Sequence, residues 1–205
     1  MIKIDKSSEP IEWKKFRLTP GVCYEAKPEL KKALLEEQGY ICAYCMRRIP
    51  VRDSNSDETS RIEHIKCQTN YSHLALHYNN MVICCPGAIN SDFHCDKKKE
   101  KSDITFSLFR HNIFDTISYE TKSGKIKSSD SKWDNEINTI LNLNNVLLQL
   151  HRKEVIDATR KVLADKRWKN AKLNEQLSKW QSLDKNGKRK AYCGVVIWYL
   201  SKKIK

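Results

Sequence analysis

Apolar and polar residues alternate in a way that predicts a helix near the start of the chain. In residues 27–40, "KPELKKALLEEQGY", the side chains of Leu30, Leu34 and Leu35 share one face. Pro28 suits the first turn of this helix, and Gly39 suits a left-handed end. Before it, residues 1–27 contain two prolines and few apolar residues, so we expect an irregular arm that wraps over the rest of the protein.

The middle of the chain has shorter apolar stretches separated by turn-forming residues. Residues 40–103 predict a compact α+β unit with few long elements. Residues 104–109, "ITFSLF", read as a strand. Residues 117–129 read as a β-hairpin that turns at Ser123 and Gly124.

Helical periodicity returns from Trp133 to the end of the chain. It predicts three or four helices packed as a bundle, within residues 133–168, 171–183 and 191–200. Trp168, Trp180 and Trp198 are expected core aromatics of this bundle, with stacking on nucleic-acid bases as the alternative.

Composition indicates a globular protein with a polyanionic partner. The chain has 205 residues, 40% of them hydrophobic, and no apolar stretch resembles a signal peptide or a membrane span, so we expect a cytoplasmic protein. The net charge is +13, and residues 131–205 alone hold 17 Lys/Arg against 7 Asp/Glu. This excess favours nucleic acid over a membrane surface as the partner; a helical bundle kept soluble by lysine is the alternative.

Eight cysteines are present, and most lie in one cluster, which favours metal binding over disulfides. The predicted zinc ligands are Cys42, Cys45, Cys85 and Cys95, a closed structural site. Two alternatives stay open: Cys84 in place of Cys85, and His94 in place of Cys95. Three further cysteines are expected to be small core residues: Cys23, Cys67 and Cys193.

An acidic residue and a histidine stand side by side in "IEHIKCQTN", as Glu63 and His64. They are followed by "YNNMVICC", which contains Asn80, and by "HCDKKK", which contains Asp96. The order of these motifs resembles the HNH nuclease family, whose ββα-metal fold ends its first strand with such a pair. Asp96 stands where that family has His or Asn.

The same motifs, together with "EQGYICAYCMRRI", resemble the PtuB family, the HNH component of Septu and retron-associated antiphage systems. That resemblance implies a bacterial defence nuclease that works with an ABC-type ATPase, PtuA, and in retron-linked systems with a reverse transcriptase and its non-coding DNA or RNA. It divides the chain into an arm and helix (1–35), an HNH core (36–103), and a hairpin with a basic helical region (104–205). It also implies that Asn80 orients the loop and the histidine.

Phosphodiester hydrolysis needs a base for the attacking water and a cation beside the scissile phosphate. His64 suits the base because an imidazole titrates near physiological pH. Glu63 and Asp96 suit Mg²⁺ or Mn²⁺, which need only one or two protein oxygens. Since neighbouring side chains of a strand face opposite sides, we expect a kink or bulge at Glu63. His94 is the rival of Asp96 as the third catalytic residue.

Three lysines directly follow Asp96 and are expected to meet substrate phosphates: Lys97, Lys98 and Lys99. DNA is the first expected substrate and RNA, including tRNA, the second. The competing interpretations are a zinc-stabilised nucleic-acid-binding module without catalysis, and a scaffold whose basic tail docks onto an acidic partner.

Overall fold

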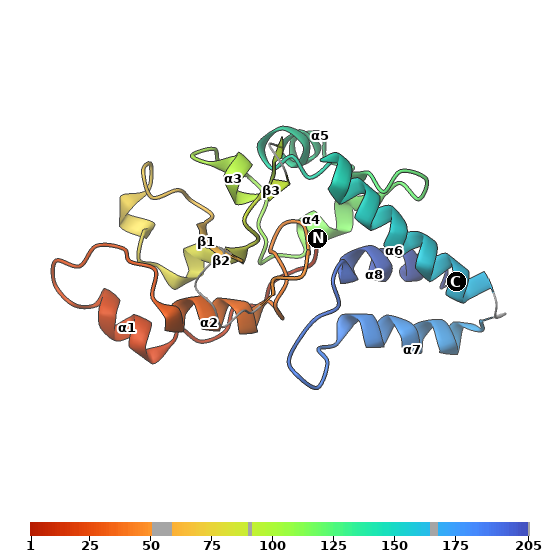
Figure 1. Ribbon diagram of the computed structural model, residues 1–205, viewed down its shortest axis with the longest axis horizontal. Coiled ribbons are helices and arrows are strands. Elements are labelled where there is room, and N and C mark those ends of the chain that lie inside the picture. The colour runs from red at the N-terminus through yellow and green to blue at the C-terminus, as the bar shows by residue number, and fades with distance from the viewer. Residues whose placement is uncertain (51–58, 90–91, 165–167, 205) are drawn as a thin grey trace.

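The computed structural model describes residues 1–50, 59–89, 92–164 and 168–204, and shows a mostly helical α+β protein with small antiparallel hairpins (Figure 1). The elements follow in this order: α1 (Ile11–Arg17), α2 (Pro28–Glu37), β1 (Arg61–His64), the 3₁₀-helices η1 (Ser72–Leu74) and η2 (Tyr78–Asn80), β2 (Met81–Cys84), β3 (Ala88–Ile89), β4 (Asp92–Phe93), α3 (Asp96–Lys99), α4 (Asn112–Thr116), β5 (Ile117–Tyr119), β6 (Ile126–Ser128), α5 (Ser131–Asn135), the π-helical turn η3 (Glu136–Ile140), α6 (Val146–Ala164), α7 (Asn170–Gln181) and α8 (Cys193–Ser201). In Figure 1, α1, α2 and the β1–β2 hairpin occupy one half of the molecule and α6, α7 and α8 the other.

Strands β1 and β2 form the hairpin that carries the motif residues. Pairing is antiparallel and runs one to one, from Arg61 opposite Cys84 to His64 opposite Met81. No bulge interrupts this described segment, so the kink or bulge expected at Glu63 is wrong. Helix α3 follows this hairpin after the short β3–β4 pair.

Helix α2 confirms its prediction and packs beside β2. Leu30 and Leu34 are fully buried, and the chain leaves the helix through Gly39 at φ +62°. The amide of Gln38 then fastens the helix to the strand: its Nε2 donates to the Ile83 carbonyl at 2.8 Å, and its Oε1 accepts from the Ile83 N–H at 2.7 Å. Both backbone groups of a buried strand residue are thereby satisfied.

Two segments differ from expectation. The arm is not wholly irregular, because residues 11–17 form α1 and bury Trp13 to 1% exposure. Residues 104–109 do not form a strand. Ile104, Phe106 and Leu108 are buried as alternation predicts, but the backbone of the segment bonds to Glu136 and Ile4 and not to a neighbouring strand: the Thr105 N–H donates to the Glu136 carboxylate, and the Ile4 N–H donates to the Leu108 carbonyl. Burial alone therefore produced the alternating pattern.

The hairpin and the C-terminal helices confirm their predicted types. Strands β5 and β6 pair from Ile117 opposite Ser128 to Tyr119 opposite Ile126, with Gly124 at φ +75° in the turn. The long helical stretch is broken between η3 and α6, where Asn142 is left-handed at φ +45°.

Helix α8 packs between α6 and α7. Against expectation, Trp168, Trp180 and Trp198 are only partly buried and lie at the margin of the core. The guanidinium of Arg152 is buried in α6 and donates to the Gly124 and Leu143 carbonyls at 2.6 and 2.8 Å, which joins the helix to the β5–β6 turn.

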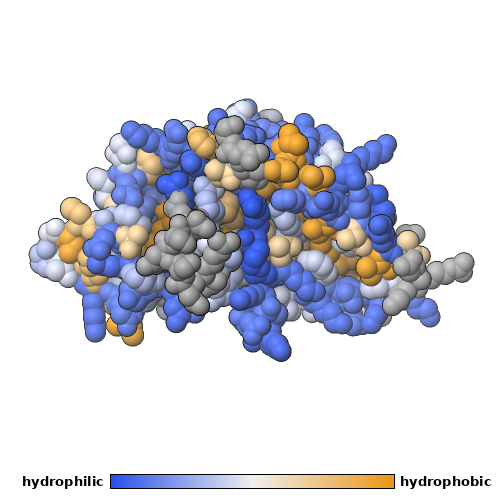
Figure 2. All heavy atoms as spheres, in the orientation of Figure 1, coloured by the Kyte–Doolittle hydropathy of each residue, from blue (hydrophilic) through white to orange (hydrophobic). Residues whose placement is uncertain are grey.

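Hydrophilic residues cover most of the face in Figure 2, with smaller hydrophobic patches between them. None of the helices among the described residues is both long enough and apolar enough to cross a membrane.

Candidate functional site

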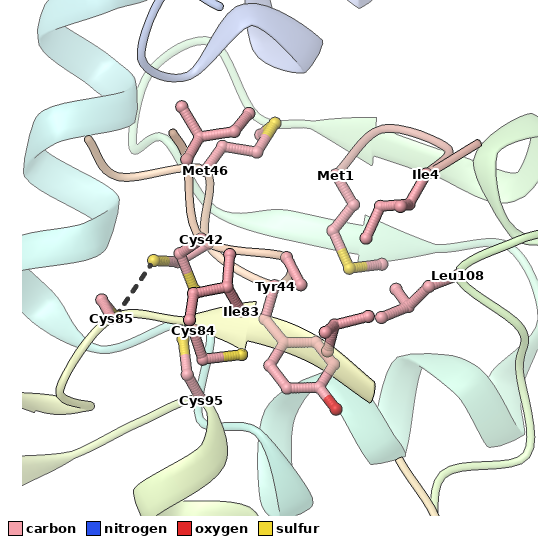
Figure 3. Close-up of a cluster of buried hydrophobic side chains, with 14 of the residues drawn as sticks. Met1, Ile4, Cys42, Tyr44, Met46, Ile83, Cys84, Cys85, Cys95 and Leu108 are labelled. Carbon is pink, nitrogen blue, oxygen red and sulfur yellow. Dashed lines mark hydrogen bonds between the residues drawn. The ribbon is translucent and has the colours of Figure 1, made fainter. Parts of the chain in front are cut away.

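Four cysteines from three separate turns meet in the interior. Cys42 and Cys45 lie in a tight turn after α2, Cys85 directly follows β2, and Cys95 directly precedes α3. Cys95 has a left-handed backbone at φ +56°, and its N–H donates to the Leu141 carbonyl at 2.8 Å. Figure 3 shows Cys42, Cys84, Cys85 and Cys95 grouped together, with Cys84 on the side of the buried Tyr44 ring.

The spacing of the four sulfur atoms fits a tetrahedral zinc ion. All four lie within 4.8 Å of one another, and the Cys42–Cys95 and Cys45–Cys85 pairs are 3.8 and 3.7 Å apart. Zinc–sulfur bonds of about 2.3 Å give a regular tetrahedron an edge of about 3.8 Å. The expected grouping of these cysteines is therefore confirmed, and it suits a closed structural site.

The four thiols differ in the direction of their pKa shifts, because burial raises the pKa of Cys45 and that of Cys95 well above the usual value. Burial by itself raises the pKa of Cys42, but hydrogen bonds from the other cysteines outweigh it and hold that pKa well below its usual value. A thiolate is the form that zinc binds. Cys84 lies outside the set of four sulfur atoms that gather within 4.8 Å of one another. Cys67 and Cys193 are buried as expected, whereas Cys23 is exposed and that prediction is wrong.

His94 lies beside the thiol cluster. Its Nδ1 is 3.1 Å from the Cys95 Sγ, and the side chain is fully buried. Cys95 supplies the fourth sulfur, so neither alternative role of His94, as a zinc ligand or as the third catalytic residue, matches this placement.

Glu63 of β1 lies at the centre of a buried cluster of polar side chains. Its Oε1 accepts from the Tyr44 hydroxyl at 3.0 Å and lies 3.0 Å from the Lys99 Nζ. Burial, and then a hydrogen bond with Asp96, raises the pKa of Glu63 to about 8. Two carboxyl groups that approach this closely in the interior favour a shared proton or a shared cation.

Asp96 begins α3, and its carboxyl group acts on the pKa of Glu63 and on that of His64. Its Oδ2 is 3.2 Å from the Arg61 Nε, and its charge acts to raise the pKa of His64. The fold thus brings the carboxyl groups of Glu63 and Asp96 together although 33 residues separate them, whereas His64 points to the other face of the regular strand β1. Within the described ranges, only the four thiols gather three or more ligand atoms closely, so a cation here would take two protein carboxylates.

Both ring nitrogens of His64 have partners. Nε2 is 2.9 Å from the Ala75 carbonyl oxygen, and Nδ1 is 3.0 Å from the Gln68 side-chain amide nitrogen. The ring is 6% exposed, and burial lowers the pKa of His64 below its usual value. The ring of Tyr24 stands edge-on at 4.5 Å between centres.

Asn80 fixes the loop between His64 and β2. Its Oδ1 accepts from the Lys66 N–H at 2.9 Å, and its Nδ2 donates to the Lys66 and Leu74 carbonyls at 2.9 and 3.2 Å. Ala75, which contacts His64, directly follows Leu74. The side chain therefore holds this loop in place.

The three lysines of α3 do not lie together. Lys98 is exposed, and Lys97 places its Nζ 4.4 Å from the centre of the Phe93 ring. Lys99 is fully buried on Glu63, and its Nζ also lies 3.4 Å from the His64 carbonyl oxygen. The expected phosphate contact by Lys99 is corrected: this lysine is the counter-ion of Glu63.

Four residues of the site were missed in the sequence. Gln68 follows His64 by four residues, and Tyr44 lies inside the first cysteine turn, but neither is part of a spaced motif. Arg61 begins β1 two residues before Glu63. Tyr24 belongs to the arm, and no local pattern connects it with His64.

No protein-family model matches this chain, and no curated protein matches it either.

Proposed function

We propose that the chain is a metal-dependent HNH-type endonuclease in which β1, β2 and α3 form a ββα-metal core. The observation that carries this proposal is the close approach of two carboxyl groups, those of Glu63 on β1 and Asp96 on α3, next to the strand end that bears His64 and in the same core as a cluster of four thiols. A purely structural core has no need of two facing carboxyl groups.

The hydrogen bonds of His64 support its role as the base. A carbonyl oxygen only accepts, so Nε2 next to Ala75 carries the proton, and Nδ1 keeps its lone pair. The Gln68 amide then donates to Nδ1, an assignment that follows from this tautomer. A lowered pKa keeps the ring neutral at physiological pH, as a base requires.

Glu63 and Asp96 are the residues that would hold Mg²⁺ or Mn²⁺, since both ions prefer oxygen ligands and keep several waters. A bound divalent cation would supply charge stabilisation at the scissile phosphate. Lys99 and Tyr44 orient the Glu63 carboxylate from behind.

In the reaction, His64 Nδ1 takes a proton from a water molecule after the Gln68 amide moves aside. The water oxygen forms a bond to phosphorus, the phosphorus–oxygen ester bond breaks, and the leaving oxygen receives a proton from solvent. The zinc site takes no part; it joins the turn after α2 to the ends of β2 and α3 and so keeps the hairpin against the helix.

We also propose, from the motif resemblance, that this nuclease acts on DNA, or on RNA including tRNA, within a bacterial defence complex with an ABC-type ATPase. A Mg²⁺-dependent cleavage assay with and without that ATPase tests this part. The genes that neighbour this one add a second test, because a reverse transcriptase beside the ATPase would indicate the retron-linked form.

The alternative is a zinc-stabilised nucleic-acid-binding module without catalysis. One observation favours it. Lys99 forms an ion pair with Glu63, and the Gln68 amide contacts the Nδ1 of His64, so both side chains already have partners within the protein.

The decisive experiment compares His64→Ala with His73→Ala, a matched change of an exposed histidine in the same loop. Each protein is incubated with single-stranded and duplex DNA and with RNA in Mg²⁺, with its partner ATPase if cleavage requires it. We expect His64→Ala to lower the cleavage rate about 10²- to 10⁴-fold, the usual contribution of a general base, with zinc content and circular dichroism unchanged. Cleavage by His64→Ala at the rate of His73→Ala would refute the assignment.

A further inference from the structure

An aromatic side chain is exposed on the surface a few residues before Asp96 of the candidate cation site. Phe93 is 40% exposed and lies in β4, three residues before Asp96. Single exposed apolar residues are common on proteins and need no explanation by themselves. Phe93 differs because the backbone that carries it is held firmly in place.

The loop between η3 and α6 anchors β4. The Asn142 side-chain amide donates to Asp92 Oδ1 at 2.9 Å and to the Phe93 carbonyl at 2.8 Å, and the Asn145 amide donates to Asp92 Oδ2. Successive side chains of a strand point to opposite faces. Asp92 therefore points toward this loop, and the Phe93 ring points away from it, toward α3.

The neighbour of the ring on α3 is a cation. The Nζ of Lys97 lies 4.4 Å from the ring centre, a cation–π distance. Lys97 directly follows Asp96, and Lys98 beside it is exposed. An aromatic face, an ammonium group and a carboxylate of the candidate cation site thus lie within one short stretch of chain.

We propose that Phe93 and Lys97 form a stacking platform for an unpaired nucleobase, so that the preferred substrate is single-stranded nucleic acid or an unpaired nucleotide. This inference rests on the proposed nuclease function and adds its substrate class. Proteins bind single strands by stacking bases on aromatic rings while cations hold the phosphates. Inside a duplex both faces of each base are already stacked on neighbours, so the ring selects strands whose bases are free. Lys97 holds the phosphate of the stacked nucleotide and so directs the nucleic-acid strand toward Asp96.

The test is binding of one fluorescein-labelled oligonucleotide, either alone or annealed to its complement, in buffer without Mg²⁺ and without chelator. We expect Phe93→Leu, which keeps an apolar side chain but removes the π face, to weaken single-strand binding about 5- to 100-fold, the range of base–aromatic stacking. Duplex binding should change less than about twofold. Phe93→Trp should restore or strengthen single-strand binding, and Lys97→Ala should weaken both substrates with a smaller salt dependence. The matched control is Leu150→Ala, an exposed apolar residue of α6.

A second readout uses 2-aminopurine in the single strand, whose fluorescence falls on stacking. The wild-type protein and Phe93→Trp should quench it, and Phe93→Leu should not. Equal loss of single-strand and duplex binding in Phe93→Leu, or full single-strand affinity without the ring, would overturn the platform. The two proposals can fail separately. A protein that never cleaves but shows this stacking pattern would support the platform and refute the nuclease. A protein that cleaves without the pattern would support the nuclease and refute the platform.

Discussion

Replacing single cysteines tests the metal centre most directly, because the chain contains a matched pair of adjacent buried cysteines. Cys85 belongs to the four-thiol cluster, and Cys84, equally buried, does not. We therefore compare Cys85→Ser with Cys84→Ala. Serine cannot replace a thiolate ligand, so the first change leaves three sulfurs for zinc, whereas the second leaves all four.

The expected magnitudes differ widely. Structural zinc contributes about 10–16 kcal/mol in small zinc-binding peptides, and a whole domain is stable by only about 5–15 kcal/mol. Two of the sulfur–sulfur distances, 3.7 and 3.8 Å, match the tetrahedral edge. Cys85→Ser should therefore lose zinc and either lose its cooperative transition or melt more than about 10 °C lower. Cys84→Ala creates only a small void, which costs about 1 kcal/mol and lowers Tm by about 2–4 °C.

The assay is elemental analysis of protein purified without chelator, followed by thermal unfolding monitored by circular dichroism. Wild-type protein and Cys84→Ala should each hold one zinc per chain, and a strong chelator should lower the Tm of both to that of Cys85→Ser. If Cys85→Ser keeps its zinc while Cys84→Ala loses it, the ligand set inferred from the geometry is wrong. Absence of zinc from the wild-type protein would refute the site itself.

Three further predictions concern the polar cluster. Burial and Asp96 raise the pKa of Glu63 from 4.5 to about 8, so the contribution of Glu63 to stability is present below about pH 4.5 and is lost as pH rises through about 8. In Mg²⁺-free buffer, the difference in Tm between wild type and Glu63→Gln should therefore fall across this range. Tm curves that stay parallel would contradict the buried carboxyl pair. Asn80→Ala should lower the free energy of unfolding by about 1–3 kcal/mol in urea titrations, since it removes three hydrogen bonds to the loop, and the exposed neighbour Asn79→Ala should change it by less than about 0.5 kcal/mol. Gln68→Leu removes the donor that favours neutral His64, so the acidic limb of the cleavage pH profile should move to higher pH; an unmoved limb would show that Gln68 does not act on the base.

Much of the fold follows from short-range patterns. Helix α2 was predictable from its leucine spacing and Gly39, and the β5–β6 hairpin from its Ser-Gly turn. The strand expected over residues 104–109 is absent for a physical reason. Residues 104–109 alternate like a strand because the core buries every second side chain, but a strand also needs a partner, and no sequence pattern supplies one.

The candidate site shows the same division. The positions of Glu63 and Asp96 were predictable from motif order, whereas the burial of Lys99 was not. In a run of three lysines, nothing in the local sequence indicates which side chain will be buried. That choice is made by the carboxylate that α3 meets when it packs on β1, 36 residues away along the chain from Lys99.

The groups that are available for chemistry can be read from the order of the residues: four soft ligands in tight turns, a carboxylate beside a histidine, and a strong excess of positive charge. How these groups meet depends on the folded packing. It excluded Cys84 and His94 from the thiol cluster, set Lys99 behind Glu63, and brought Gln68 and Tyr24 against His64. The physical reason is that turn geometry and periodicity act over a few residues, whereas the direction in which a side chain points is set by packing against elements distant in sequence.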